Sequence, residues 1–320
     1  MEQPLKILFV INDLYTRGNG LAASARRTIA LLREHGHHVR VLSALPRDGD
    51  DCGVGMPEYV LPPLRIPLVG PLIASQGYAF ARAKRREIER ALAWADVVHL
   101  EEPFCLQAVV AHYARRQGVL VVATYHIHPE NLTASVYLDR ALPLNWAILE
   151  LWKRAIFNRS DLVQCPSRSV YERVSKLRVR APLLLLSNGV PLGEEVCGGG
   201  HEVGESSVVR VLVVGRFSRE KDQATILRAL RHSAHARSIQ LTFAGRGPTE
   251  HSLRASARRL LRRGVIAHPV RFAFMSADEL AREASSCALY VHAARIEVEG
   301  LSALEVLRHG VVPIIARGPL

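Results

Sequence analysis

Short runs of β-branched and other apolar residues alternate along the chain with longer segments whose apolar residues recur every three or four positions. In the first half, strand-like runs at 7–11, 39–42, 97–100 and 120–123 alternate with helical patterns, the first of them at 21–34. Short apolar runs are typical of buried strands, whereas a period near 3.6 predicts an amphipathic helix. The alternation therefore predicts βαβ units and a parallel sheet covered by helices.

The same alternation continues to the end of the sequence. A long amphipathic segment at 144–158 precedes strand-like runs at 161–165 and 183–186, with a helix expected to start at Pro166-Ser167. A second series of strand-like runs then alternates with helices that begin at 224, 250, 277 and 301, the runs being 209–214, 239–244, 270–274, 289–292 and 312–316. The second half is therefore expected to be another βαβ domain.

The two series are separated by a stretch without periodicity. Residues 191–207 are rich in glycine and acidic residues, which is typical of a linker. We therefore expect an N-terminal domain at 1–190, a linker at 191–207 and a C-terminal domain at 208–320. The expected fold class is α/β, with two Rossmann-like domains that face each other across a cleft at the carboxyl ends of their strands.

Composition places the protein among globular chains with a large core. Of 320 residues, 48% are hydrophobic, yet no apolar run is long enough to span a bilayer. The first six residues lack the basic-then-apolar order of a signal peptide, so a cytoplasmic location is expected. The five cysteines are scattered and form no C-x-x-C pair, which favours reduced packing residues over disulfides or a zinc site.

The charge points to an anionic partner. A net charge of +12 attracts nucleotides, nucleic acid or acidic lipid, but it is spread over both halves, which argues against a nucleic-acid-binding tail. The helical segment at 80–92 concentrates basic residues beside an apolar stripe. It is either a solvated helix face or a surface that docks on an anionic membrane, so a peripheral position at the inner face of a membrane stays open.

Two acidic residues around a glycine form the most informative motif. Glu297 and Glu305 lie eight positions apart, and Gly300 between them opens an apolar helical pattern that begins at Leu301. Carboxylates accept hydrogen bonds from hydroxyl groups, and backbone N–H groups at a helix start suit a phosphate. This stretch is either a site for a sugar nucleotide or a solvated helix face.

A basic segment upstream supplies the positive charge that a phosphate-binding site needs. The strand at 209–214 runs into Gly215, and Arg216 and Lys221 follow. Arginine suits bidentate contacts with phosphate, and lysine provides a point charge. A diphosphate leaving group has to be neutralised by groups of this kind.

Together the two motifs resemble the donor site of retaining GT-B glycosyltransferases of family 4, with the pattern G-R…E-K followed far downstream by E-x7-E. The resemblance covers nearly the whole chain. It implies a nucleoside diphosphate sugar, UDP- or GDP-linked, as donor substrate and no separate cofactor. It assigns Arg216 and Lys221 to the diphosphate, Glu305 to the ribose and Glu297 to the hexose. Glu299 stands where many members have an aromatic residue, so the sugar preference of better-known members does not transfer.

In the first half, His126 follows the strand at 120–123. The family has a histidine at this place, near the reacting anomeric carbon, and the resemblance therefore makes His126 a catalytic candidate. Its imidazole would orient sugar hydroxyls or assist the departing phosphate. Glu130 and Asn131 follow closely, and they either contact donor or acceptor or cap a helix.

Further glycines are candidates for donor loops. Gly18-Asn19-Gly20 matches the G-x-G-x-x-A pattern of NAD-binding proteins, but residues 12–17 separate it from its strand and no acid ends the second strand. In the family this loop opens the first long helix and lines the acceptor and phosphate side of the cleft; a plain turn is the alternative. Gly245 and Gly247 lie in another loop that either faces the donor or is an ordinary turn.

No metal is expected. Asp48-Gly49-Asp50 matches the D-x-D motif of the GT-A fold, but it lies in a long polar loop typical of a solvated turn. The resemblance implies front-face transfer of a hexose, with retention of configuration, to a glycan, lipid or small-molecule acceptor, as in polysaccharide or glycolipid biosynthesis. Two alternatives are a sugar-nucleotide epimerase or hydrolase of the same architecture and a nucleotide-sugar-binding protein. Family members continue beyond the strand at 312–316, so the second domain is expected to be incomplete.

Overall fold

The computed structural model describes residues 3–46, 50–64, 79–191 and 208–318. The chain divides into two compact units, Met1–Asn188 and Gly189–Leu320. Except for Pro191, the expected linker lies outside the described residues, and so do Asp48 and Gly49 of the D-x-D match.

The first unit is built on a seven-stranded sheet in the order β3-β2-β1-β4-β5-β6-β7, with every pair parallel. The strands are β1 (Lys6–Val10), β2 (His38–Ala44), β3 (Tyr59–Leu61), β4 (Val97–Leu100), β5 (Leu120–Thr124), β6 (Leu162–Cys165) and β7 (Leu183–Leu185). The helices are α1 (Gly20–Glu34), α3 (Arg85–Leu92), α4 (Cys105–Gln117), α5 (Pro129–Thr133), α6 (Leu142–Ala155) and α7 (Arg168–Lys176), with short 3₁₀ turns η1 (Ala134–Val136) and η2 (Phe157–Arg159).

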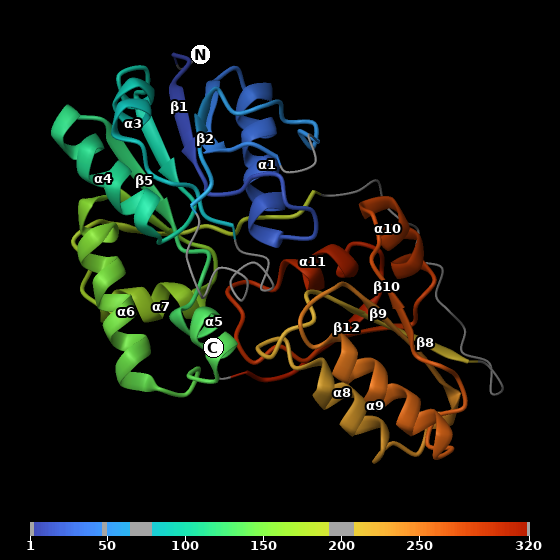
Figure 1. Ribbon diagram of the computed structural model, residues 1–320. Helices are drawn as coiled ribbons and strands as arrows, with labels where there is room; N and C mark the ends of the chain where they lie inside the picture. The colour runs from blue at the N-terminus through green and yellow to red at the C-terminus, as the bar shows by residue number, and fades with distance from the viewer. Residues whose placement is uncertain (1–2, 47–49, 65–78, 192–207, 319–320) are drawn as a thin grey trace. The chain divides into compact units, whose positions relative to one another are not determined.

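Strand β1 lies in the interior of this sheet, where it pairs with β2 on one side and β4 on the other. Its residues Leu8, Phe9 and Val10 have no exposed surface. Figure 1 shows α1 on one face of the sheet and α3 and α4 on the other. Ala25 and Ile29 of α1 pack into the same cluster as Phe9, which explains why the apolar stripe of 21–34 is spaced as a helix.

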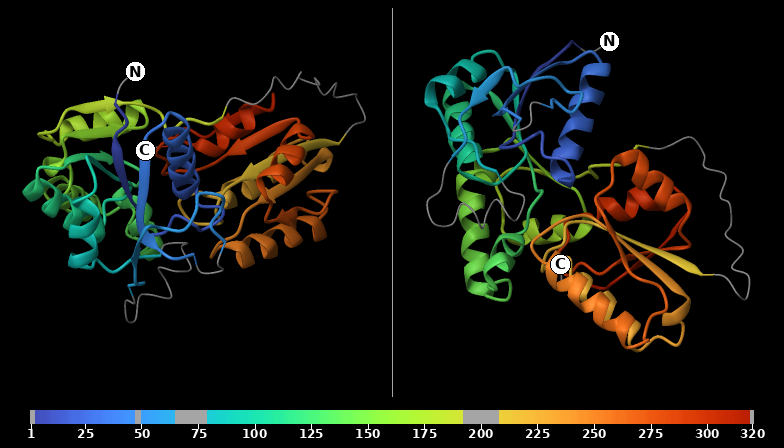
Figure 2. Two further views of the ribbon diagram at one scale, coloured as in Figure 1. Left: turned by 90° about the horizontal axis from the view of Figure 1, so that it is seen from above. Right: turned by 45° about the vertical axis from the view of Figure 1, so that its right-hand side comes forward.

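The second unit has a five-stranded parallel sheet in the order β10-β9-β8-β11-β12. The strands are β8 (Val209–Val214), β9 (Ile239–Ala244), β10 (Arg271–Ala273), β11 (Leu289–His292) and β12 (Val312–Ile315). The connecting helices are α8 (Gln223–Leu230), α9 (Glu250–Arg262), α10 (Ala277–Ser285) and α11 (Leu301–Leu307), with a 3₁₀ turn η3 (Ala236–Ser238). Figures 1 and 2 show α8 and α9 on one face of this sheet and α10 and α11 on the other.

An aromatic cluster anchors the loop that follows β8. The rings of Phe217, Phe243 and Phe272 lie with centroids 5.3–6.1 Å apart, and Phe217 is completely buried. Phe217 therefore fixes the residues that follow Gly215 against the core of the unit.

The predicted parallel sheets are confirmed, and most strands agree with the sequence pattern within one or two residues. The short strand β3 was not predicted, and the helix expected at 144–158 ends at Ala155. No described helix combines the length and the apolar character that crossing a membrane requires.

Candidate functional site

The predicted residues of the second unit gather at one edge of its sheet. Gly215 follows β8, Gly245 follows β9, and the segment that contains Glu297 follows β11. These three strands are neighbours and run parallel, so their carboxyl ends meet at the same edge. This is the edge at which open α/β sheets bind their ligands.

At this edge the two sequence motifs meet through an ion pair. Lys221 Nζ donates to Glu297 Oε2, although the two residues are 76 positions apart. The same carboxylate oxygen lies 3.0 Å from His292 Nε2. His292 Nδ1 in turn lies 3.0 Å from the hydroxyl of Tyr290, which is 2.9 Å from Ser302 Oγ. Lysine, carboxylate and imidazole thus form one connected cluster, which we call the Lys221–Glu297 cluster.

The partners of Glu297 keep it ionised. Burial alone would raise the pKa of this carboxyl, but Lys221 and His292 outweigh burial and hold the pKa well below its usual range. The side chains of Lys221 and Glu297 remain 24% and 26% exposed. An ionised carboxylate and an ammonium group are therefore both accessible at the edge of the sheet.

Arg216 is held in the same loop. Its guanidinium pairs with the buried carboxylate of Glu220, and its carbonyl accepts from Gln223 Nε2 at 2.8 Å. Arg295 N donates to the carbonyl of Glu220 at 2.8 Å, so the loops after β8 and β11 are joined through backbone as well. The cationic loop is thereby fixed to the loop that carries Glu297.

Gly245 and Gly247 permit a close backbone contact. A Cβ atom added to Gly245 would lie 2.1 Å from the carbonyl oxygen of Gly215, and one added to Gly247 would lie 2.3 Å from that of Phe217. Phe217 N also donates to the carbonyl of Arg246 at 2.8 Å. Both glycines therefore hold the loop after β9 against the loop after β8. That this loop faces the donor stays a prediction.

Gly300 adopts a left-handed backbone, with φ 73°, and Leu301 is the first residue of α11. The glycine makes the turn from the Glu297 segment into the helix, a conformation that side chains rarely adopt. Glu305 lies half-buried on α11, about one turn beyond Leu301. The helical pattern predicted to start at 301 is confirmed.

In the first unit, His126 belongs to a largely buried triad that the sequence did not reveal. His126 Nε2 lies 2.8 Å from Glu101 Oε2, and His99 Nδ1 lies 2.9 Å from the other oxygen of the same carboxylate. Burial would raise the pKa of Glu101, but the two imidazoles overcome this and hold it well below the usual range. His126 follows β5 and Glu101 follows β4, so this triad also stands at the carboxyl edge of its sheet.

Glu130 and Asn131 have partners within the first unit. Asn131 Oδ1 accepts from His128 N at 2.9 Å, which makes it a helix-capping residue of α5. Glu130 is buried and accepts from Arg173 at 2.7 Å, and Arg173 also lies 3.1 Å from His128 Nδ1. For Asn131 the structure favours capping, whereas Glu130 is part of an ionic cluster that ties α5 to α7.

Gly18 and Gly20 lie at the start of α1. Gly18 has φ 75°, and Gly20 is the first helical residue after Asn19, whose side chain accepts from Leu21 N. Beside this helix start, Asn12 donates through N and Nδ2 to Glu102 at 2.7 and 2.6 Å. The loop is a capped helix start near the carboxyl ends of β1 and β4.

Sequence reasoning missed Glu101, Glu102, His292 and Tyr290. The pair Glu101-Glu102 had a usable signal, since two acids directly after a buried strand come to the carboxyl edge of a parallel sheet. His292 had a weaker signal, because it ends a strand only five residues before Glu297. Among the described residues, no group of three His, Cys, Asp or Glu side chains is suited to hold a metal ion.

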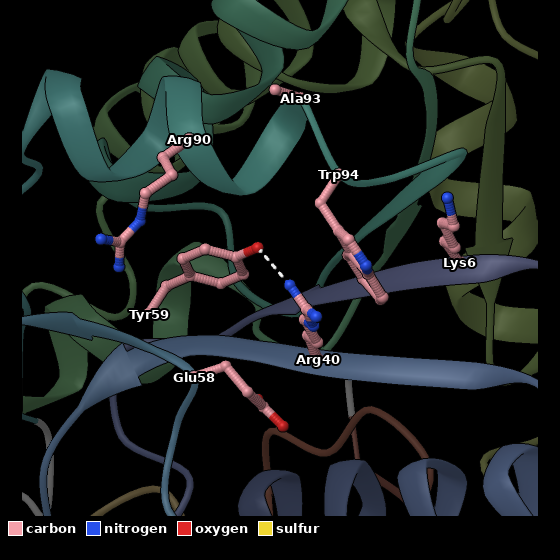
Figure 3. Close-up of a pocket in the computed structure, with 7 residues that line it drawn as sticks. All are labelled: Lys6, Arg40, Glu58, Tyr59, Arg90, Ala93 and Trp94. Carbon is pink, nitrogen blue, oxygen red and sulfur yellow. Dashed lines mark hydrogen bonds between the residues drawn. The ribbon is translucent and has the colours of Figure 1, made fainter.

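A hollow of about 530 Å³ lies elsewhere on the first unit. Figure 3 shows Arg40 between the rings of Tyr59 and Trp94, with the Arg40 guanidinium 4.3 Å from the Trp94 ring and bonded to the Tyr59 hydroxyl at 3.0 Å. The lining residue Lys6 begins β1, so the hollow is near the amino ends of the strands. It is therefore separate from the triad at the carboxyl edge.

Two parallel α/β units of this kind define the GT-B fold. Residues 18–194 match the family described as Glycosyltransferase Family 4, and residues 205–319 match the family described as Glycosyl transferases group 1. The chain belongs to glycosyltransferase family 4, and its C-terminal part is a group 1 glycosyl transferase domain.

Solved structures show the same fold at low sequence identity. HepE from Anabaena, in complex with UDP and glucose, is 15% identical with a TM-score of 0.64, over 98% of this chain and 81% of that one. The pneumococcal O-GlcNAc transferase GtfA, in complex with UDP and GlcNAc, is 11% identical with a TM-score of 0.68, over 100% and 85%. Sucrose-phosphate synthase from Thermosynechococcus elongatus is 18% identical with a TM-score of 0.68, over 98% and 82%. No curated protein matches the chain in sequence.

Proposed function

We propose that this glycosyltransferase moves a hexose from a nucleoside diphosphate sugar to a glycan, lipid or small-molecule acceptor, with retention of configuration. The observation that carries the proposal is the Lys221–Glu297 cluster, which brings an ammonium group and an ionised carboxylate to the carboxyl edge of the sheet. The structures of HepE and GtfA contain UDP together with a sugar, which supports UDP-linked sugars as the first donors to test.

The proposed roles follow from charge. Lys221 and Arg216 neutralise the diphosphate as the glycosidic bond breaks, and Glu297 accepts hydrogen bonds from hexose hydroxyls. Since Glu297 is already paired with Lys221 and His292, it suits hydroxyl binding better than nucleophilic attack. We therefore propose front-face attack, in which the leaving phosphate takes the proton of the acceptor hydroxyl. His126 orients hydroxyls near the reacting carbon, and Glu305 binds the ribose.

We also propose that no metal takes part, because the two cationic side chains supply the positive charge that the leaving diphosphate requires. Turnover should be unchanged by a chelator such as EDTA. A loss of turnover on chelation that added Mg²⁺ or Mn²⁺ restores would contradict this part of the proposal.

Donor binding is tested first, by a thermal-shift screen with UDP, GDP, ADP and their sugars. A nucleotide that binds the folded protein raises its melting temperature, so the largest shift identifies the base. Turnover is then measured with the corresponding sugar nucleotide. Release of sugar from the donor without an acceptor would favour the hydrolase alternative, and a change of the sugar while it remains linked would favour an epimerase.

Lys221→Ala is expected to lower transfer by about two to three orders of magnitude, because it removes a charge that stabilises the leaving group. Arg231→Ala is the matched control, since Arg231 is exposed just beyond the far end of α8. The control should keep wild-type turnover and melting temperature. Equal turnover of Lys221→Ala and the wild type would reject the assignment of Lys221.

A further inference from the structure

The first unit exposes an unusual number of large apolar side chains around η1 and the start of α6. Seven of the sixteen residues from 136 to 151 are large, apolar and at least 40% exposed. Six of them define what we call the η1–α6 surface, namely Val136, Tyr137, Leu138, Leu142, Trp146 and Leu151. Tyr137 and Leu142 are the most exposed, at 74% and 73%. Contiguous exposed apolar side chains of this kind mark a surface that contacts a partner or a membrane.

This surface is held in place by buried polar contacts. Thr133 Oγ1 donates to Asn145 Oδ1 at 2.8 Å, and Asn145 Nδ2 donates to the carbonyl of Asp139 at 2.9 Å. Leu138 N donates to the carbonyl of Thr133 at 2.9 Å. Asn145 is 1% exposed, so it anchors the loop to the first turns of α6 from inside. The apolar side chains therefore belong to an ordered surface.

The pattern of α6 shows that its outer side is adapted to an apolar environment. The helix buries Asn145, Leu149 and Trp152 within the first unit. A helix on the surface of a globular protein usually has polar residues on the opposite side. Here Trp146 and Leu151 point outward instead, at 52% and 62% exposure. Figure 1 shows α6 at the outer side of the first unit.

The charges around the surface indicate which environment it meets. Arg140 is exposed, and the Arg154 side chain is 74% exposed. Of the acids in this segment, Asp139 is buried and Glu150 is paired with Lys153 and Arg154. Because Lys153 and Arg154 share one carboxylate and Arg140 is exposed, the net charge beside the apolar residues is positive. A second copy of this chain would bring like charges together, whereas anionic lipid headgroups complement them.

We infer that the η1–α6 surface docks on an anionic lipid bilayer. Leucine and valine side chains would enter the apolar boundary region, Tyr137 and Trp146 would lie at the level of the headgroups, and Arg140 and Arg154 would contact lipid phosphates. The inference stands apart from the proposed donor chemistry, because it rests on exposure and charge in the first unit.

The basic segment at 80–92, for which the sequence allowed either a solvated helix face or a docking surface, does not have the same properties. The apolar stripe of α3 is buried, with Ile88 at 0% and Leu92 at 1% exposure. Its arginines at 85 and 90 pair with Glu89 and Glu87 within the helix. The helix thus presents charge without apolar residues, which favours the solvated-face interpretation.

Co-sedimentation of the full chain with vesicles tests the inference. The vesicles are phosphatidylcholine alone or with about one third phosphatidylglycerol, and the wild type is expected to pellet with the anionic vesicles. Leu142→Gln with Trp146→Gln should weaken that partitioning by about tenfold or more, because both side chains lose their transfer into the bilayer. Leu31→Gln with Leu120→Gln is the matched control, since both leucines are about half exposed in the same unit but off the surface. The control should bind like the wild type.

Two further measurements decide the result if the double variant folds poorly. Tyr137→Ser alters a residue outside the helices and should also weaken binding. Quenching of tryptophan fluorescence by brominated lipid should be strong in the wild type and largely lost in Trp146→Phe.

The inference would be overturned if the wild type did not pellet with anionic vesicles, or if the variants bound them as well as the wild type does. A wild-type dimer that the double variant loses would also overturn it, because it would assign the surface to a second copy. Nucleotide-induced thermal shifts, measured on the same variants, report separately on the donor proposal.

Discussion

Two consecutive carboxylates show how strongly the immediate partners decide the chemistry of a residue. Glu101 and Glu102 both follow β4, and both are buried. Glu101 is bonded to two imidazoles, which hold its pKa low. Glu102 receives hydrogen bonds from the neutral amides of Asn12 and Gln107, and burial raises its pKa to about 7 in spite of them. One carboxylate is thus kept ionised, and its neighbour titrates near neutral pH.

Glu102 should make the protein less stable as the pH rises. Its pKa is about 7 in the folded state against an ordinary value of 4.5, so between these values the folded state binds more protons than the unfolded state. The unfolding free energy is therefore expected to fall from about pH 4.5 to 7, by up to about 3 kcal/mol, and then to level off. The Glu102→Gln variant should not show this decrease in unfolding free energy when urea denaturation is measured at each pH.

Glu172→Gln, at an exposed position on α7, is the matched control and should keep the wild-type pH profile. If Glu102→Gln and the wild type lose stability in parallel across this range, Glu102 does not titrate as described.

At the scale of elements, two loops of the second unit, those after β8 and β9, pack directly backbone against backbone. The loops after β8 and β9 touch backbone to backbone at Gly245 and Gly247. Neither loop can move away without breaking the bond from Phe217 N to the carbonyl of Arg246. The position of Arg216 therefore depends on two glycines that lie about 30 residues further along the chain.

Alanine at position 245 or 247 should be strongly destabilising. The new Cβ atom would lie 2.1 or 2.3 Å from a backbone oxygen, so the loops would have to separate. We expect a loss of about 3 kcal/mol or more in the free energy of unfolding, measured by urea denaturation of each variant. Gly20→Ala is the control, because an added Cβ there meets nothing within 4 Å and the helix start tolerates alanine. Comparable losses in all three variants would contradict the steric explanation.

The sequence predicts the elements better than it predicts the contacts between them. Apolar runs located most strands, as in β1, where residues 7–10 are all buried, and helical periodicity located the starts of α9, α10 and α11. β3 was not predicted because its three residues lie between prolines at 57 and 62 and are too few to show a period. Lys221 and Glu297 were found by motif, but their direct pairing was not, since it depends on β8 and β11 being neighbours in the sheet. The Glu101 triad was missed for the same reason, because it joins β4 and β5.

At the scale of the whole molecule, the net charge of +12 supports binding of an anionic substrate. The basic residues occur in both units and outnumber the acidic ones, with 42 Lys and Arg against 30 Asp and Glu. Long-range attraction raises the local concentration of a multiply charged ligand, and salt screens it.

Nucleotide affinity should therefore fall with ionic strength. The nucleotide that gives the largest thermal shift is titrated by calorimetry in about 50 mM and about 500 mM NaCl, where the Debye length falls by roughly threefold. We expect weaker binding at high salt, because the phosphates lose attraction to Lys221, Arg216 and the general positive field. The corresponding nucleoside, which carries no phosphate, is the control and should show little dependence on salt. Equal salt dependence of both ligands would exclude the phosphates as the cause.

The strand order of the first sheet also has a consequence for how the chain folds. The interior strand β1 lies between β2 and β4, and its pairing with β4 joins residues about 90 positions apart. During synthesis from the amino end, the apolar residues of β1 remain incompletely covered until residues 97–100 have left the ribosome. Long-range parallel pairing is slow, and exposed apolar strands aggregate. The chain is therefore expected to fold late in translation and to benefit from chaperones when it is overproduced.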